Sequence, residues 1–196
     1  MLITGIKSKP VYAPLCADVT GRHHLMLGVG LGGAALLRVV AELETAAPAA
    51  LATTRVLLAA EDTFERTGIA SLARFDDQAP LLEAFTTALE GSLMGTRLYV
   101  AGPESFIGRA MQIALRFNLN KDEIRAEECG TLARRVRCVH CRTTTEEVRT
   151  NIVRCAGCDR WLLVRDHYSR RLAAYMGVMV DAEAPGELPP IREIYL

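Results

Sequence analysis

Over residues 1–130, continuous apolar runs typical of buried strands alternate with segments in which apolar residues recur at helical spacing. An apolar run that starts at His23 ends in a cluster of glycines, and apolar residues then recur at helical spacing, at Leu36, Leu37, Val40 and Leu43. Further apolar runs predict strands at 54–62, 74–77, 96–103 and 123–129, and amphipathic segments predict helices at 79–91 and 105–119. Strands that alternate with helices favour an α/β fold, in which a parallel sheet carries helices on both faces.

The charge of the chain changes near residue 131. Residues 1–130 contain 12 Lys and Arg against 15 Asp and Glu, whereas residues 131–180 contain 10 Arg, no Lys and only 4 Asp and Glu. Such a shift marks a domain boundary. We therefore predict an α/β domain at 1–130, a small second domain at 131–180 and a C-terminal tail at 181–196.

Four of the six cysteines form two Cys-x-x-Cys pairs, with residues 142–154 between the pairs: Cys138, Cys141, Cys155 and Cys158. Four thiolates at two turns complete a tetrahedron around Zn²⁺, or around a single iron of the rubredoxin kind. The N-terminus lacks the apolar core of a secretory signal and no apolar run is long enough to cross a membrane, so we expect a cytoplasmic location. Because that compartment is reducing, a metal site is favoured over disulfides, with zinc preferred and iron as the alternative.

A small core is predicted around this site. Thr and Val stand at strand-like positions in 142–154, and residues 159–169 predict the next strand. Trp161, Leu163 and Tyr168 are predicted to cover the metal and to form the core of this domain. A domain of this size has too small a core to fold by itself, so a bound metal is needed to stabilise it.

Two histidines flank the predicted ligands but are not predicted to bind the metal. His140 lies inside the first Cys pair and His167 follows the second. Four thiolates already close the site, so both histidines are expected at the surface or around the ligands. A closed site is structural, or transfers electrons if it holds iron, and it has no open position for a hydrolytic water. We predict no catalytic residue in this chain.

The glycine cluster that follows the first strand occupies the position where a parallel sheet binds ligands. A glycine turn at a helix N-terminus can hold a phosphate, and Gly28, Gly30, Gly32 and Gly33 allow close backbone approach. The same glycines also fit a tight strand-to-helix turn without a ligand. Their spacing differs from the G-x-G-x-x-G of dinucleotide sites, which leaves both interpretations open.

Three motifs occur in order between residues 20 and 130. They are a glycine turn, a Y-x-A-G-P-x-x-F segment and a closing pair: Gly28 and Gly30; Tyr99, Gly102, Pro103 and Phe106; Glu127 and Gly130. In these positions the chain resembles the nicotinamide-nucleotide domain of ferredoxin-reductase-type flavoproteins, especially the phthalate dioxygenase reductase kind. The resemblance implies a degenerate nucleotide site at Gly28, Gly30, Gly102 and Pro103.

The departures from that family concern the residues next to the nicotinamide. Where the family has Thr-Pro in the turn this chain has Gly32 and Gly33, and where the late motif has Cys it has Ala101. The family's flavin-binding barrel also precedes the nucleotide domain, and here only residues 1–20 stand in that place. NAD(P)H chemistry on this chain alone is therefore not expected.

The stretch 138–178, taken with the order of the two domains, resembles the small, DmmA-like subunit of bacterial dimethylamine monooxygenase. The resemblance implies a cytoplasmic hetero-oligomeric monooxygenase that uses reduced nicotinamide nucleotides to demethylate secondary amines. It also implies that haem lies in one partner subunit and that flavin and an iron–sulfur cluster lie in a reductase subunit. On this interpretation the chain is an assembly or coupling subunit without a catalytic site of its own.

Two other functions stay open at this point: a zinc-ribbon protein that binds nucleic acid, and an autonomous nucleotide-dependent oxidoreductase. Sparse aromatics, the absence of Lys from the basic segment and an isoelectric point near 6.9 argue against nucleic acid. Arginine without lysine suits carboxylate pairing at a protein interface. We therefore predict that a partner subunit contacts several of the following arginines: Arg134, Arg135, Arg137, Arg142, Arg149, Arg154, Arg160 and Arg165.

Overall fold

The computed structural model describes residues 8–60, 64 and 68–196. The chain divides into two compact units, one of Tyr12–Gly130 and one that combines residues 8–11 with Thr131–Leu196. Among the described residues, no helix has both the length and the apolar character that a membrane span requires.

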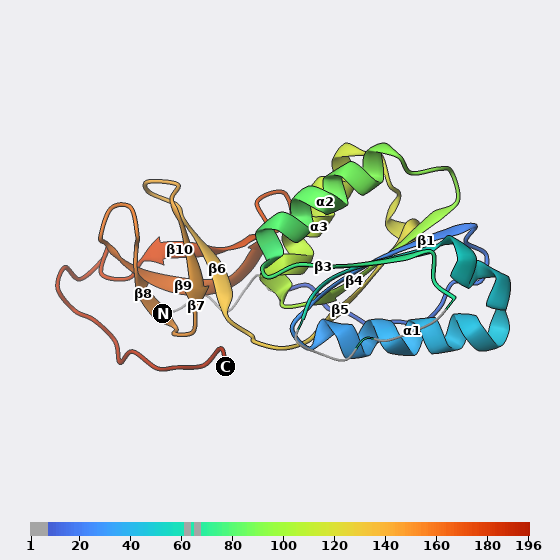
Figure 1. The fold of residues 1–196 in the computed structure, drawn as a ribbon. Helices are drawn as coiled ribbons and strands as arrows, with labels where there is room; N and C mark the ends of the chain where they lie inside the picture. The colour runs from blue at the N-terminus through green and yellow to red at the C-terminus, as the bar shows by residue number, and fades with distance from the viewer. Residues whose placement is uncertain (1–7, 61–63, 65–67) are drawn as a thin grey trace. The chain divides into compact units, whose positions relative to one another are not determined.

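The first unit is a five-stranded parallel sheet with the strand order β3-β2-β1-β4-β5. Its strands are β1 (His23–Val29), β2 (Thr54–Ala59), β3 (Ser71–Arg74), β4 (Thr96–Gly102) and β5 (Ile124–Glu128). Its helices are α1 (Gly32–Ala46), α2 (Gln78–Glu90) and α3 (Glu104–Arg116), with short 3₁₀ turns η1 (Pro48–Thr53) and η2 (Lys121–Glu123). Helix α1 covers one face of the sheet and α2 and α3 cover the other, which confirms the predicted α/β fold (Figure 1).

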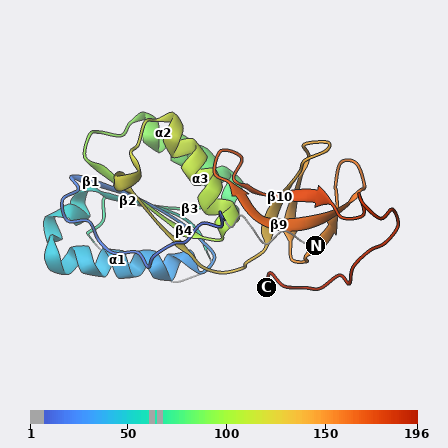
Figure 2. The same cartoon turned by 180° about the vertical axis from the view of Figure 1, so that it is seen from behind.

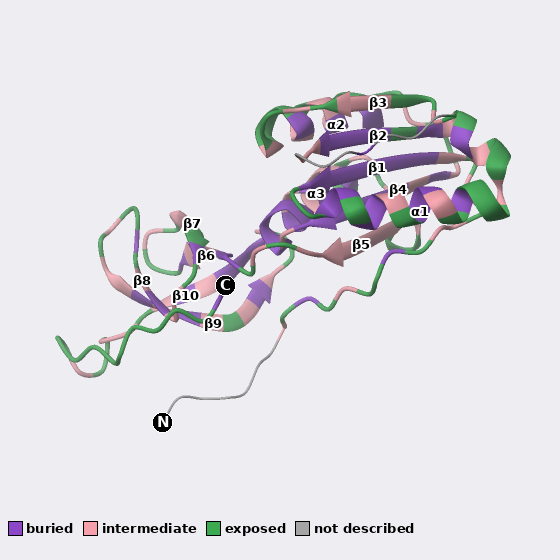
Figure 3. Ribbon diagram, turned by 60° about the horizontal axis from the view of Figure 1, so that its bottom comes forward, coloured by how far each residue is buried: buried purple, intermediate pink, exposed green. Residues whose placement is uncertain are grey.

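Both faces of the sheet are buried. In β1, Leu25 and Leu27 pack into the core beneath α2 and α3, whereas Met26 packs into the core beneath α1. Burying one such side chain contributes about 1.5–3 kcal/mol, so a central strand with two buried faces needs an unbroken apolar sequence. Figure 3 shows that β1 and β2 are buried along most of their length.

The third strand lies earlier than predicted. The sequence indicated a strand at 74–77, whereas β3 spans Ser71–Arg74. Asp77 instead caps helix α2, where its side chain accepts a hydrogen bond from the backbone N–H of Gln78 at 2.6 Å. Asp favours helix caps over strands, and this preference outweighs the weak strand signal. The last two residues of the predicted strand 54–62 lie outside the described residues.

The second unit contains a five-stranded sheet of mixed direction. Its strands are β6 (Arg134–Cys138), β7 (Thr144–Val148), β8 (Ile152–Arg154), β9 (Trp161–Ser169) and β10 (Ala174–Met179), in the order β7-β6-β10-β9-β8. Strands β6 and β10 are parallel, and all other neighbours are antiparallel. Figure 2 shows the antiparallel pair β9 and β10. Strands β6 and β10 are not among the strands predicted from the sequence.

The core of this unit is built by alternate residues of its strands. Along β9, Leu162, Val164 and Tyr168 are buried, which agrees with the prediction for Tyr168. The prediction that Trp161 and Leu163 belong to this core is wrong, because successive side chains of a strand point to opposite faces and these two lie half-exposed on the other face.

The second unit includes described residues from near both ends of the sequence. Ser8 exchanges hydrogen bonds with the backbone of Tyr168, its hydroxyl donating to the carbonyl and accepting from the N–H. At the other end, Tyr195 is buried in the core and Leu196 accepts a hydrogen bond from the backbone of Leu132. The unit therefore includes residues beyond 180 that the sequence placed in a tail.

Candidate metal centre

The first cysteine pair lies in a tight turn between β6 and β7. Cys138 is the last residue of β6, and its carbonyl accepts a hydrogen bond from the N–H of Arg142 at 3.0 Å. Its own N–H donates to the carbonyl of Thr143 at 2.9 Å. Arg142 has φ 63°, a left-handed conformation that closes the turn directly after Cys141.

The second pair repeats this geometry between β8 and β9. The carbonyl of Cys155 accepts a hydrogen bond from Asp159 at 3.0 Å, and its N–H donates to Arg160 at 2.9 Å. Asp159 also adopts a left-handed conformation, with φ 59°. The two turns are therefore copies of one structure, and each directs two thiols to the same point.

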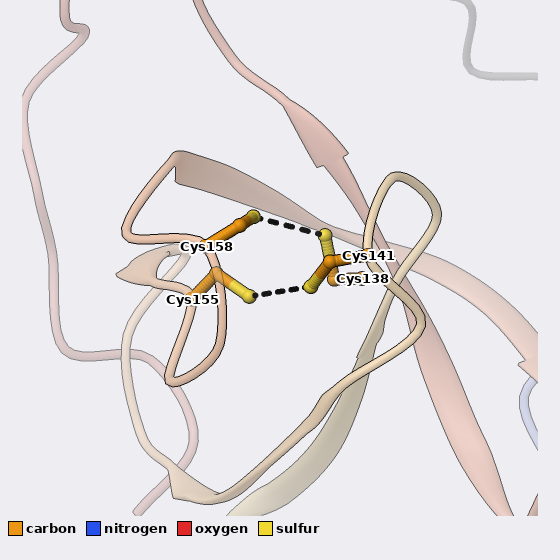
Figure 4. A group of neighbouring side chains, drawn as sticks. All are labelled: Cys138, Cys141, Cys155 and Cys158. Carbon is orange, nitrogen blue, oxygen red and sulfur yellow. Dashed lines mark hydrogen bonds between the residues drawn. The ribbon is translucent and has the colours of Figure 1, made fainter.

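The four sulfur atoms face one another across a small gap (Figure 4). All four lie within 4.8 Å of one another, with 3.9 Å between Cys138 and Cys158 and 3.4 Å between Cys141 and Cys155. A tetrahedral site with metal–sulfur bonds of about 2.3 Å has sulfur–sulfur edges of about 3.8 Å. These separations fit a tetrahedral metal and are far too long for a disulfide of about 2.05 Å.

The turns also stabilise the thiolates of Cys141 and Cys158, and the thiolate is the form that binds a metal. Hydrogen bonds from Thr143 lower the pKa of the Cys141 thiol to about 6. A backbone hydrogen bond from Arg160 lowers the pKa of Cys158. Burial raises the pKa of Cys155 to about 11, so a nearby cation is needed to favour its thiolate.

His140 and His167, which were not predicted to bind the metal, both lie outside the group of four cysteines. His140 is exposed and its Nδ1 lies 3.2 Å from the guanidinium of Arg160. His167 is half-buried on β9. Among the described residues, the close group of metal-ligating side chains consists of the four cysteines alone.

Gly157 sets how closely the two turns approach, and its replacement by Ala is expected to weaken metal binding. A Cβ at this position would meet the Thr143 hydroxyl and would lie 2.7 Å from the Thr143 Cβ, so the turns would have to separate. We expect Gly157→Ala to lower the affinity for a metal ion at least about tenfold, as a misplaced ligand shell does. Competition with a chromogenic chelator measures this. Ala156→Ser, at the exposed neighbouring position, is the control and should leave the affinity unchanged. Equal affinities for both variants would contradict this account of the turns.

The glycines of the first unit meet at the point where the strand order reverses. Strands β1 and β4 are neighbours, with Gly28 paired to Ala101, while the chain continues outward from them in opposite directions. Gly30 follows the carboxyl end of β1, and Gly102 and Pro103 stand at the carboxyl end of β4. In open α/β sheets this switch point is where ligands bind.

Packing accounts for two of the turn glycines. A Cβ on Gly28 would lie 2.9 Å from both Leu36 and Leu58, and a Cβ on Gly32 would overlap the carbonyl of Ala101. Both positions therefore exclude side chains because protein atoms fill the space. Gly30 differs, since it has φ 51° and a Cβ there would meet nothing within 4 Å. Of the three, Gly30 alone borders open space.

Glu127, on strand β5, is engaged within its own unit. Its carboxylate accepts hydrogen bonds from the backbone N–H of Leu15 and from the guanidinium of Arg38, both at 2.6 Å. The side chain of Leu15 is buried in the core beneath α1. The segment before β1 and helix α1 thus hold this carboxylate.

The arginines of the second unit do not form a single surface. Arg134 is buried, forms an ion pair with Asp166 at 2.7 Å and donates a hydrogen bond to Tyr195 at 2.9 Å. Arg135 pairs with Glu146 at 2.9 Å. Because the guanidinium of Arg134 is inside the core of the unit, the predicted contact with a partner concerns the other arginines of the set.

Two family models match the chain. The N-terminal domain model of the dimethylamine monooxygenase subunit DmmA-like proteins matches residues 4–124, and the C-terminal domain model matches residues 135–178. The chain belongs to the DmmA-like family. This confirms the family predicted from the sequence. The four cysteines lie within the range that the C-terminal domain model matches.

A curated relative and several solved structures are also similar to this DmmA-like chain. The heme-dependent oxidative N-demethylase delta subunit of Ectopseudomonas mendocina (strain ymp) is 35% identical over 115 residues, which are 59% of this chain and 66% of the relative. Phthalate dioxygenase reductase is 15% identical with a TM-score of 0.46, covering 67% of this chain and 45% of that one. The ferredoxin reductase of carbazole 1,9a-dioxygenase is 15% identical with a TM-score of 0.45, covering 60% and 34%.

Proposed function

We propose that this chain is a haem-free coupling subunit of a hetero-oligomeric oxidative N-demethylase. In this complex a partner subunit holds haem, and a reductase subunit with flavin and an iron–sulfur cluster draws electrons from NAD(P)H. The substrate is dimethylamine or a similar secondary amine. Membership of the DmmA-like family across both domains carries the proposal, and the name of the relative, a heme-dependent N-demethylase delta subunit, supports it.

In this proposal the four-cysteine centre holds zinc. Cys138, Cys141, Cys155 and Cys158 supply four thiolates at tetrahedral separations, and this set leaves no free coordination position for substrate or water. Zinc has no redox chemistry at such a site, so its role is to fix the fold of the second unit. A single iron in the same cage is the alternative, and it would give the unit an electron-transfer role.

The structure of the first unit supports assigning hydride transfer to a partner subunit. Gly28 and Gly32 serve packing, and Glu127 is bound to Leu15 and Arg38, so these three residues of the first unit are engaged within the protein, whereas Gly30 borders open space. Such an arrangement supports a partner subunit as the place of hydride transfer. Weak binding of a phosphate group near Gly30 is compatible with this proposal.

The isolated chain is therefore expected not to oxidise NADH or NADPH, even with added FAD or FMN. Loss of nucleotide absorbance in the near ultraviolet measures this, with a flavoprotein reductase as the positive control. Because the proposal gives the reaction to other subunits, adding the chain to a preparation of those subunits should raise coupled N-demethylation instead. Steady nucleotide oxidation by the purified chain would contradict the proposal and favour an autonomous oxidoreductase.

A further inference from the structure

A groove of about 660 Å³ lies beside the first cysteine turn of the second unit. One wall is formed by β6 and the turn that follows it, with Arg137, Val139 and Arg142. The other wall is formed by β9, β10 and the loop between them, with His167 and Leu172. Its volume is in the range of sites that hold a small molecule or a few residues of a peptide.

The first wall of the groove carries positive charge. No Asp or Glu is among the described residues that line the groove. Arg137 donates a hydrogen bond to the hydroxyl of Thr144, a neutral partner, at 3.3 Å. The exposed side chain of Arg142 makes no hydrogen bond or ion pair with another described residue. Arg134 and Arg135, by contrast, each pair with a carboxylate.

The chemistry of the lining favours an acidic peptide over other anions. Guanidinium groups bind carboxylates through two parallel hydrogen bonds, and Val139, Leu172 and Met176 add apolar surface to the lining that a free phosphate would not use. Val139 is 53% exposed, so it offers apolar surface to a partner. A nucleic acid would need an exposed ring for base stacking, whereas the aromatic ring of the lining, Tyr175, is only 1% exposed.

The first turn connects this groove to the metal centre. Arg142 follows Cys141 directly, and Cys138 itself lines the groove. A bound metal would therefore hold one wall rigid and present Arg142 at small entropic cost. Loss of metal would disorder the same wall.

We propose that this groove is the docking site for an acidic segment of another subunit of the N-demethylase complex. The inference rests on the proposed function, because it takes the complex as the source of the partner. It assigns docking to Arg137 and Arg142, and it excludes the core residue Arg134.

The test is co-purification of the tagged full-length chain with the other subunits from its native host, using Arg137→Glu combined with Arg142→Glu. We expect the charge reversal to reduce recovery of the partner subunits at least about tenfold while the metal content stays at the wild-type level. Arg149→Glu is the matched control, since Arg149 is exposed in the same unit and does not line the groove, and it should retain the partners.

The possible results distinguish a failure of the docking proposal from a failure of the proposed function. If the wild type and the double variant both retain the partners, the groove is not the docking site and the proposed function stands. If the wild type itself recovers no partner subunits, the proposed function fails, and the docking proposal fails with it. If the wild type retards DNA or RNA with a steep salt dependence and the double variant does not, the groove binds nucleic acid and the peptide proposal is wrong.

Discussion

Replacing Cys155 by Ser is expected to abolish metal binding and to unfold the second unit. Cys155 is buried and its sulfur lies 3.4 Å from that of Cys141, so its loss opens the cage and removes a ligand. Binding of a structural zinc by four such ligands contributes about 10–16 kcal/mol to folding, which is more than the small core of this unit supplies. Elemental analysis and amide hydrogen exchange along β6–β10 measure both effects.

The first unit should survive this change, because the parallel sheet of Tyr12–Gly130 has its own two cores. Cys16→Ser is the matched control, since Cys16 is an exposed free cysteine outside the group, and it should change neither metal content nor exchange. Retention of one metal per chain and of slow exchange in β6–β10 by Cys155→Ser would show that the four cysteines do not form the site.

Replacing Arg134 by Ala is expected to destabilise the metal-loaded second unit by about 3 kcal/mol, since three kinds of contact are lost together. The guanidinium lies between two rings, 3.9 Å from the centre of Tyr175 and 3.8 Å from that of Tyr195, and it also bonds Asp166 and the Tyr195 hydroxyl. Its removal leaves a cavity and takes away a desolvated cation–π contact of up to about 2 kcal/mol as well as charged hydrogen bonds. Urea denaturation with metal present, followed by exchange or fluorescence of the tyrosines, measures the loss.

The exposed Arg149 provides the comparison for this prediction. Arg149→Ala should change stability by less than about 0.5 kcal/mol, as surface substitutions usually do. Arg134→Lys should restore little of the stability that Arg134→Ala loses. An ammonium group cannot stack between two rings and also bond Asp166 and the Tyr195 hydroxyl, as the planar guanidinium does. An Arg134→Ala variant as stable as Arg149→Ala would mean that the C-terminal residues do not pack against the core as described.

The sequence predicted most of the first unit because its central strands are buried on both faces. Strands β1, β2 and β4 need continuous apolar residues, and such runs are visible without knowledge of the partners. The short strand β3 was misplaced because its residues, Ser71–Arg74, are half-exposed or exposed at the sheet edge and carry no periodic signal. Asp77 lies within the predicted strand, but in the structure it caps helix α2.

The metal ligands were predictable because their chemistry is local. Each Cys-x-x-Cys turn is closed by hydrogen bonds within its own short segment, so the spacing in the sequence already determines the geometry. Strands β6 and β10 were not predictable in the same way, because β7, β8 and β9 all lie between them in the sequence. The Arg-rich sequence of β6 reads as surface, and only the contacts of Arg134 with Tyr175 and Tyr195 make a buried arginine possible there.

The roles of the individual arginines also depended on the tertiary structure. Their number indicated an interaction surface, but sequence alone cannot tell a guanidinium that pairs inside the unit from one that faces outward. Asp166 lies far along the chain from Arg134, and Glu146 lies on the strand next to that of Arg135. These pairings form only after the sheet has assembled, and among the described residues they leave Arg142, beside the groove, without a carboxylate partner.

Affinity purification of this chain from its native host tests the proposed function most directly. The measurement is the visible absorption spectrum and the subunit composition of the eluate, with the metal content determined on the same sample. The account predicts a haem absorption band, a haem subunit in stoichiometric ratio to this chain, and one further zinc per chain. A colourless eluate containing this chain alone, together with undiminished N-demethylation in a host from which the chain has been deleted, would contradict it.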